Sequence, residues 1–82
     1  MKVTVISPEQ AVFEGEAQSV VAPAFDGLVG ILARHAPFVT VLGEGQLTIK
    51  EGGQVRHFGI SGGFLQVSGG VVRVVADRVT IA

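Results

Sequence analysis

The segment Gly59–Gly63 has the sequence G-I-S-G-G, which matches the G-x-S-x-G pattern of a nucleophile elbow. That elbow works only where a strand turns into a helix, with a histidine and an acid supplied from elsewhere in a larger sheet. Here strand-like residues lie on both sides of the motif, no helical stretch follows, and 82 residues are too few for such a fold. We therefore predict a hairpin turn at Gly62-Gly63 and no catalytic serine.

The two histidines, His35 and His57, are the next candidates for chemistry. A zinc site needs three or four ligands, and this chain has no cysteine and no H-x-H or H-E-x-x-H spacing. His57 lies beside Arg56 in an alternating segment and is predicted at the surface or edge of a sheet. His35 lies in an A-R-H-A-P turn, where its ring can hydrogen-bond to nearby backbone. We predict no metal site.

Glu14 and Glu16 lie on one face of an extended segment, as a pair of catalytic carboxylates could. Exposed strands commonly have such charges for solubility, so solvated charge is the better interpretation. None of the glycine-rich turns opens a helix or precedes G-K-[ST], so none is predicted to bind phosphate.

Lys50 raises an alternative function, because it lies next to the Glu51-Gly52-Gly53 turn. Swinging-arm carrier domains of the biotinyl or lipoyl type are small β structures with a modified lysine at a hairpin tip. Lys50, however, is expected to end a strand rather than to occupy the tip. With no nucleophile, base and orienting group assembled, we predict no catalytic residue and no cofactor, and a binding or structural module is favoured.

Composition excludes several further classes. The net charge is −1, with six basic and seven acidic residues and no basic patch, so nucleic acid is an unexpected partner. The N-terminus lacks the apolar stretch of a secretory signal, and the apolar runs are too short to cross a bilayer. We expect a soluble cytoplasmic protein with no direct membrane insertion.

The elements that position these residues are predicted to be strands, because apolar residues recur with period two. Of the residues, 48% are hydrophobic and only 16% are charged, which favours sheet over helix. By residue number, the predicted strands are 2–6, 12–14, 17–22, 28–32, 38–42, 46–50, 55–60, 64–67 and 71–76. Paired glycines at Gly52-Gly53, Gly62-Gly63 and Gly69-Gly70 are predicted to form tight turns of a meander. About eight to ten short strands in one domain, residues 1–82, predict a two-layer sandwich or a small barrel.

Three segments together resemble a known family. They are Val3–Gln10 followed by V-F-E-G, Asp26–Leu32 leading to H-A-P-F at 35–38, and Ile60–Val67 followed by V-V-A-D at 74–77. Their order and spacing resemble the N-terminal domain of the F-type ATP synthase epsilon subunit, over essentially all 82 residues. The resemblance implies an all-β fold, a flattened β-sandwich of about ten short strands in two sheets.

The resemblance also implies a role. Such a subunit joins the central-stalk gamma subunit to the membrane-embedded c ring while a proton gradient drives ATP synthesis, and it performs no reaction itself. The chain would then lie at the cytoplasmic face of the bacterial inner membrane, as a peripheral part of F1.

The resemblance further implies contact residues. The loops of the c ring would face Asp26, Gly27, Leu28, Arg34 and His35. The family often has a glutamate where this chain has Leu28 and a glycine where it has Arg34, and Asp26 is the candidate to replace the acid. The gamma-facing side would include Ser7 and Thr40, and an exposed apolar face is expected to await a partner.

Many family members continue into a two-helix C-terminal domain that can inhibit ATP hydrolysis or bind ATP. This sequence ends at R-V-T-I-A, where that hairpin would begin. We therefore expect no inhibitory arm and no ATP binding in these 82 residues.

Overall fold

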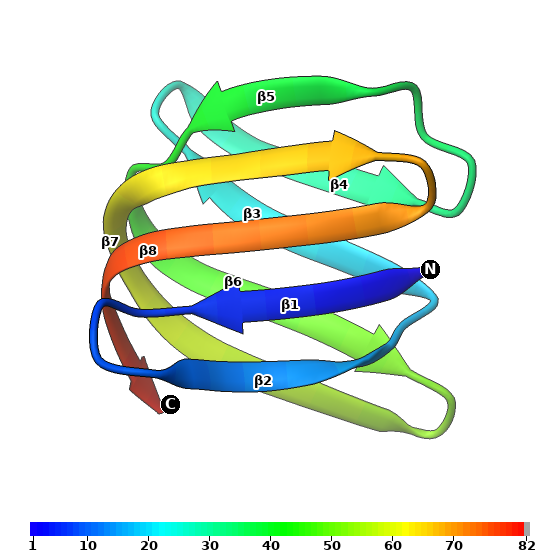
Figure 1. Ribbon diagram of the computed structural model, residues 1–82, viewed down its shortest axis with the longest axis horizontal. Helices are drawn as coiled ribbons and strands as arrows, with labels where there is room; N and C mark the ends of the chain where they lie inside the picture. The colour runs from blue at the N-terminus through cyan, green and yellow to red at the C-terminus, as the bar shows by residue number, and fades with distance from the viewer. Residues whose placement is uncertain (82) are drawn as a thin grey trace.

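A computed structural model describes residues 1–81, which form eight strands and connecting turns (Figure 1). The strands are β1 (Lys2–Ile6), β2 (Ala11–Glu16), β3 (Ser19–Ala24), β4 (Gly27–Leu32), β5 (Phe38–Val41), β6 (Glu44–Glu51), β7 (Gln54–Ser68) and β8 (Val71–Ile81). The predicted all-β class is confirmed. No helix within residues 1–81 has the length and apolar character that crossing a membrane requires.

The strands form one continuous hydrogen-bonded sheet, in the order β2-β1-β8-β7-β6-β3-β4, with β5 added beside β7. This sheet folds over itself into two layers, which Figure 1 shows as a front layer and a back layer. The front layer holds β5, the end of β7, the start of β8, β1 and β2, whereas β4, β3, β6, the start of β7 and the end of β8 form the back layer. The body is flattened, with extents of 26 × 25 × 20 Å. The predicted sandwich is therefore confirmed, although its layers are hydrogen-bonded to each other as one sheet.

The eight strands fall within the predicted eight to ten, and they are slightly fewer than the ten that the resemblance implies, because β7 and β8 each contribute a segment to both layers. Counted by layer, five strand segments lie in front and five behind. The difference arises at Gly62-Gly63, where we predicted a hairpin turn. The structure instead has β7 running unbroken for 15 residues through both glycines.

Two other strands end later in the structure than predicted. β2 continues past Gly15 to Glu16, and β3 continues past Pro23 to Ala24. Proline lacks the N–H that a central strand would use, but β3 pairs with β6 only as far as Val21. Pro23 therefore costs the sheet no hydrogen bond to β6.

The core lies between the layers and is built by alternation. In β1 the side chains of Val3 and Val5 are fully buried, and in β7 Leu65 and Val67 point the same way. The largest fully buried side chains come from both layers: Ile31, Leu47, Ile49, Leu65, Val3, Val5, Val20, Val72 and Val74. Burying such side chains is the main favourable term in folding, at about 1.5–3 kcal/mol each.

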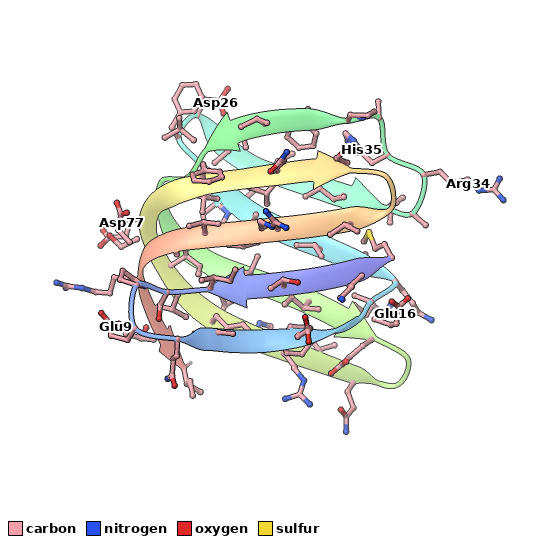
Figure 2. The ribbon with its side chains drawn as sticks, in the orientation of Figure 1. Glu9, Glu16, Asp26, Arg34, His35 and Asp77 are labelled. Carbon is pink, nitrogen blue, oxygen red and sulfur yellow. The ribbon has the colours of Figure 1, made fainter. Side chains whose placement is uncertain are left out.

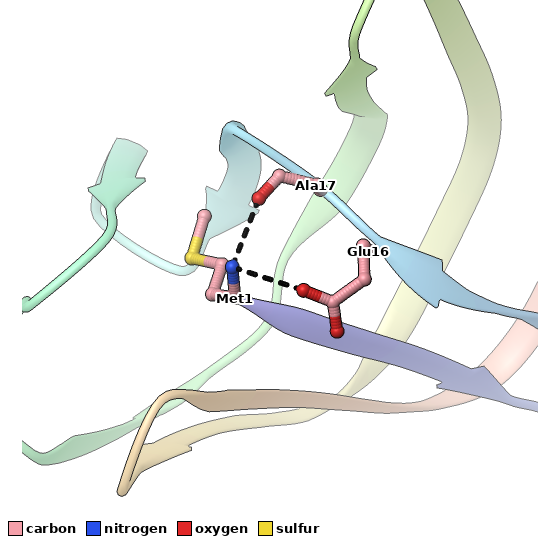
Figure 3. Close-up of polar contacts among 3 residues, drawn as sticks. All are labelled: Met1, Glu16 and Ala17. Carbon is pink, nitrogen blue, oxygen red and sulfur yellow. Dashed lines mark hydrogen bonds and ion pairs between the residues drawn. The ribbon is translucent and has the colours of Figure 1, made fainter.

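The first strand and the start of the last strand lie side by side in the front layer. β1 runs parallel to β8, with Val3 paired to Val72, and antiparallel to β2. Beyond the β1–β2 ladder, the Met1 ammonium donates a hydrogen bond to the Ala17 carbonyl at 3.1 Å and lies 3.6 Å from Glu16 Oε1 (Figure 3). The Ala17 amide donates in return to the Met1 carbonyl at 2.8 Å. These contacts extend the pairing of the two strands by one residue pair.

Candidate functional surfaces

The residues considered for catalysis do not form a catalytic group. Ser61 lies within β7, paired with Glu44 on β6 and Arg78 on β8, so no strand-to-helix elbow exists here. Within residues 1–81, no three His, Asp or Glu side chains are close enough to hold a metal ion.

The two histidines have structural contacts. His57 is exposed on β7, which agrees with its predicted surface position. Its Nδ1 is hydrogen-bonded to the Thr48 hydroxyl at 3.2 Å. His35 Nδ1 donates to the Ala36 carbonyl at 2.8 Å, and its ring packs 4.9 Å from that of Phe38. The predicted backbone bond of His35 is confirmed.

Glu14 and Glu16 project from the edge strand β2 and each faces a cation. Glu14 Oε2 lies 3.6 Å from Lys2 Nζ, and Glu16 faces the Met1 ammonium. The predicted solvated charge is confirmed, with weak surface ion pairs that are each worth about 0–1 kcal/mol.

Lys50 lies within β6, where it pairs with Val55 across the hairpin, and the tip of that hairpin is Gly52-Gly53. The lysine therefore does not occupy the tip, which is the position that a swinging-arm carrier requires.

The outer face of the front layer presents a cross-strand row of apolar side chains, which we call the apolar row: Ile6, Val75, Phe64 and Val41. The register pairs Ile6 with Val75, Val75 with Phe64, and Phe64 with Val41. Because Leu65 and Val74 point into the core, Phe64 and Val75 must point outward. Phe64 is 42% exposed and Val41 is 58% exposed. Exposed apolar rows of this kind are typical of protein-binding surfaces.

The two residues predicted to face gamma lie at opposite ends of the apolar row. Ser7 directly follows Ile6, and Thr40 directly precedes Val41. The Ser7 side chain itself is buried. Its hydroxyl donates to the Gln10 carbonyl at 3.1 Å and closes the β1–β2 turn. Thr40 lies on the half-buried side of β5. Beside Thr40 the Val41 side chain is exposed, and beside Ser7 the Ile6 side chain is half-buried.

Sequence reasoning expected an exposed apolar face but did not identify the residues of the apolar row, although a signal was present. Strict alternation fails at Phe64-Leu65 and at Val74-Val75, where two consecutive residues are apolar. In a strand, consecutive side chains point to opposite faces, so such pairs place an apolar side chain outside as well as inside.

The five residues predicted to face the c ring divide into two groups. Asp26 lies in the β3–β4 turn and Gly27 and Leu28 begin β4, whereas Arg34 lies in the turn after β4 and His35 follows it. Figure 2 shows Asp26 at the upper left of the molecule and Arg34 and His35 toward its right side. The six residues of β4 separate the groups by about 17 Å, at roughly 3.4 Å per residue. The groups therefore do not form one compact site.

Between these two groups, β4 is an edge strand. Its outer side presents the side chains of Leu28 and Leu32, which are 74% and 65% exposed. We call Asp26, Gly27, Leu28, Leu32, Arg34 and His35 the β4 edge. Arg34 has a positive φ of 70°, a conformation that glycine adopts most easily. The glycine expected at this position from the family resemblance thus has a backbone reason.

Comparison with known proteins agrees with this architecture. Residues 1–82 match the family model of the ATP synthase delta/epsilon chain beta-sandwich domain. The chain is 40% identical over 78 residues to the ATP synthase epsilon chain of Leptospira borgpetersenii, covering 95% of this chain and 61% of that one. It is 40% identical over 75 residues to the epsilon chain of Caulobacter vibrioides, covering 92% and 87%. The chain thus spans about three fifths of the first relative and most of the second.

A solved structure of the Euglena gracilis mitochondrial ATP synthase contains a similar chain. The TM-score is 0.89 at 27% sequence identity, over 96% of this chain and 51% of that one. A chain of the Tetrahymena thermophila mitochondrial ATP synthase central stalk and c ring shares the fold, with a TM-score of 0.84 at 17% identity. From the family model and the two epsilon chains, the protein belongs to the ATP synthase delta/epsilon family, as its β-sandwich domain.

Proposed function

We propose that this chain is a non-catalytic rotor component of an F-type ATP synthase, which links the gamma subunit to the c ring during proton-driven ATP synthesis. The family match over all 82 residues supports this proposal most strongly. The surface supports it as well, because two separate exposed apolar regions suit a protein that joins two partners. On this proposal, the protein is peripheral, at the cytoplasmic face of the inner membrane, as part of F1.

The gamma subunit would bind the apolar row between Ser7 and Thr40. A row that crosses four neighbouring strands is held by backbone hydrogen bonds, so it offers a partner a rigid surface. Rigid surfaces lose little conformational entropy when they bind.

The c-ring loops would bind the β4 edge. Its two turns are far apart, so contact with both Asp26 and the Arg34-His35 turn requires the whole strand to lie along the partner. Leu28 and Leu32 would then be covered, which removes two of the most exposed apolar side chains from water.

Co-purification with gamma subunit tests the proposal, using the unchanged chain and two variants. Phe64→Glu places a charge in the apolar row and is expected to weaken binding at least about tenfold, because a buried unpaired charge costs several kcal/mol. Val55→Glu is the matched control, since Val55 is 52% exposed on the N-terminal half of β7, in the back layer. It should bind as the unchanged chain does. A well-folded unchanged chain that fails to bind gamma would contradict the proposal.

A second measurement separates the two surfaces. Leu32→Glu, which changes a side chain that is 65% exposed on the β4 edge, should weaken binding of the gamma-bound chain to isolated c ring while leaving gamma binding intact. Equal loss of both partners from this one change would show that they share a surface, against the arrangement proposed here.

A further inference from the structure

Arg73 lies at the centre of the front layer's outer face. β8 is the middle strand of that layer, and Arg73 pairs with Gln66 on β7 and with Thr4 on β1. Its neighbours on the same side of β8 are Val71 and Val75, and Val75 belongs to the apolar row. A permanently charged guanidinium therefore stands between apolar side chains on a surface that otherwise suits protein contact.

The charges around Arg73 are already matched. Lys2 and Glu14, on the same face, form an ion pair at 3.6 Å, and Glu16 faces the Met1 ammonium. Arg73 takes part in none of the ion pairs formed within residues 1–81. When a partner covers this face, its guanidinium loses water without gaining a counter-charge from its own chain.

The surface beside Arg73 is hollowed. Gln66, Ser68, Val71 and Arg73 line a depression of about 290 Å³. The guanidinium, the Gln66 amide and the Ser68 hydroxyl are all hydrogen-bond donors, and the guanidinium presents them in a planar fork that matches a carboxylate. These donors suit a carboxylate, and the apolar row lies beside them.

We propose that Arg73 determines specificity on this face by receiving a single Asp or Glu side chain of the bound protein, with Gln66 and Ser68 completing the hydrogen bonds. The inference rests on the proposed function, in which that protein is the gamma subunit. The apolar row would supply area, and Arg73 would select the partner and fix its register. Arginine is one of the residue types that most often dominate interface energy.

Binding of purified gamma subunit to four versions of the chain tests this inference. Arg73→Glu should weaken binding about 30-fold or more, because it sets two carboxylates against each other in a covered site. Arg73→Lys should lose less, about fivefold, since an ammonium keeps the charge without the fork. Arg78→Glu is the control with the same charge change, on the back-layer segment of β8. It should bind gamma within about twofold of the unchanged chain, since Arg78 lies outside the proposed surface.

The partner carboxylate is then identified by replacing the acidic residues of gamma with lysine, one at a time. One such replacement should restore binding to Arg73→Glu, and the others should not. Arg73 is exposed, so its variants should keep the circular dichroism spectrum and melting temperature of the unchanged chain.

The outcomes separate the two proposals. If Arg73→Glu binds within about twofold while Phe64→Glu fails, the apolar row stands and the role of Arg73 is overturned. Equal losses in Arg73→Glu and Arg78→Glu would overturn it too, because the effect would then be one of net charge. If the folded, unchanged chain does not bind gamma at all, the proposed function fails and this inference fails with it.

Discussion

Two Gly-Gly pairs have different structural roles in this molecule. Gly52-Gly53 forms the tip of the β6–β7 hairpin, where the chain reverses direction. Gly62-Gly63 lies inside β7, which bends there and passes from the back layer to the front (Figure 1). The pair of glycines permits a sharp change of direction in both places. What decides between a reversal and a bend is the strand that lies alongside.

The surroundings of the two pairs differ accordingly. At the hairpin tip, a Cβ added to either glycine would meet nothing within 4 Å. At the bend, β8 follows β7 closely in the same register on both sides, with Ser61 opposite Arg78 and Gly63 opposite Ala76. The bend therefore needs glycine for space as well as for conformation, whereas the tip needs it for conformation alone.

Replacing Gly63 with alanine should have the largest effect. Its φ is 103°, and the new Cβ would lie 2.0 Å from the Val75 carbonyl oxygen and 2.8 Å from Ala76 Cα. Both are backbone atoms, so β7 and β8 must separate where both layers meet. We expect a loss of about 3 kcal/mol or more in the free energy of unfolding, measured by urea denaturation. A loss below about 1 kcal/mol would show that the bend yields easily.

Gly62→Ala should have a smaller effect, because the atom in the way is the tip of a side chain. Its φ is 71°, and the new Cβ would lie 2.5 Å from Asp77 Oδ2. Figure 2 shows Asp77 on the left side of the molecule, beside the bend. We expect a loss of about 1–2 kcal/mol, part of which is regained in the double variant Gly62→Ala with Asp77→Ala. Additive losses in this double-mutant cycle would exclude the clash as a cause.

Gly53→Ala should have the smallest effect, and it should not lower stability. Gly53 does not have a positive φ, unlike Gly52 at 55°, and no atom obstructs its Cβ. Alanine restricts the unfolded chain, so stability should be unchanged or raised by up to about 1 kcal/mol. In a thermal melt this corresponds to a rise of at most about 8 °C. A clear loss would mean that the tip is as constrained as the bend.

The difference between the two pairs marks the limit of what sequence predicted. The strands Lys2–Ile6 and Gly27–Leu32 were predicted nearly to the residue, because alternation and turn residues are local signals. The bend was mistaken for a turn because its cause lies in residues 71–81, which pair with β7 along its whole C-terminal half. Local sequence cannot show that such a partner is present.

The candidate surfaces were predicted in the same uneven way. The resemblance led to Ser7 and Thr40, and their positions in the chain mark the ends of the apolar row. The Ser7 side chain, however, is hydrogen-bonded within the β1–β2 turn, and the Thr40 side chain lies on the half-buried side of β5. The row itself depends on cross-strand register, which brings together residues as distant as Ile6 and Val75. Register is a property of the assembled sheet.

The parallel pairing of β1 with β8 sets an order of events during synthesis. Val3 pairs with Val72, so β1 must wait for residues 71–75 before the front layer can close. Until then β1 and β2 form an isolated hairpin, which is marginally stable in water. Contacts between such distant residues also slow folding. The nascent chain should remain accessible to proteases and chaperones until residues 71–75 leave the ribosome.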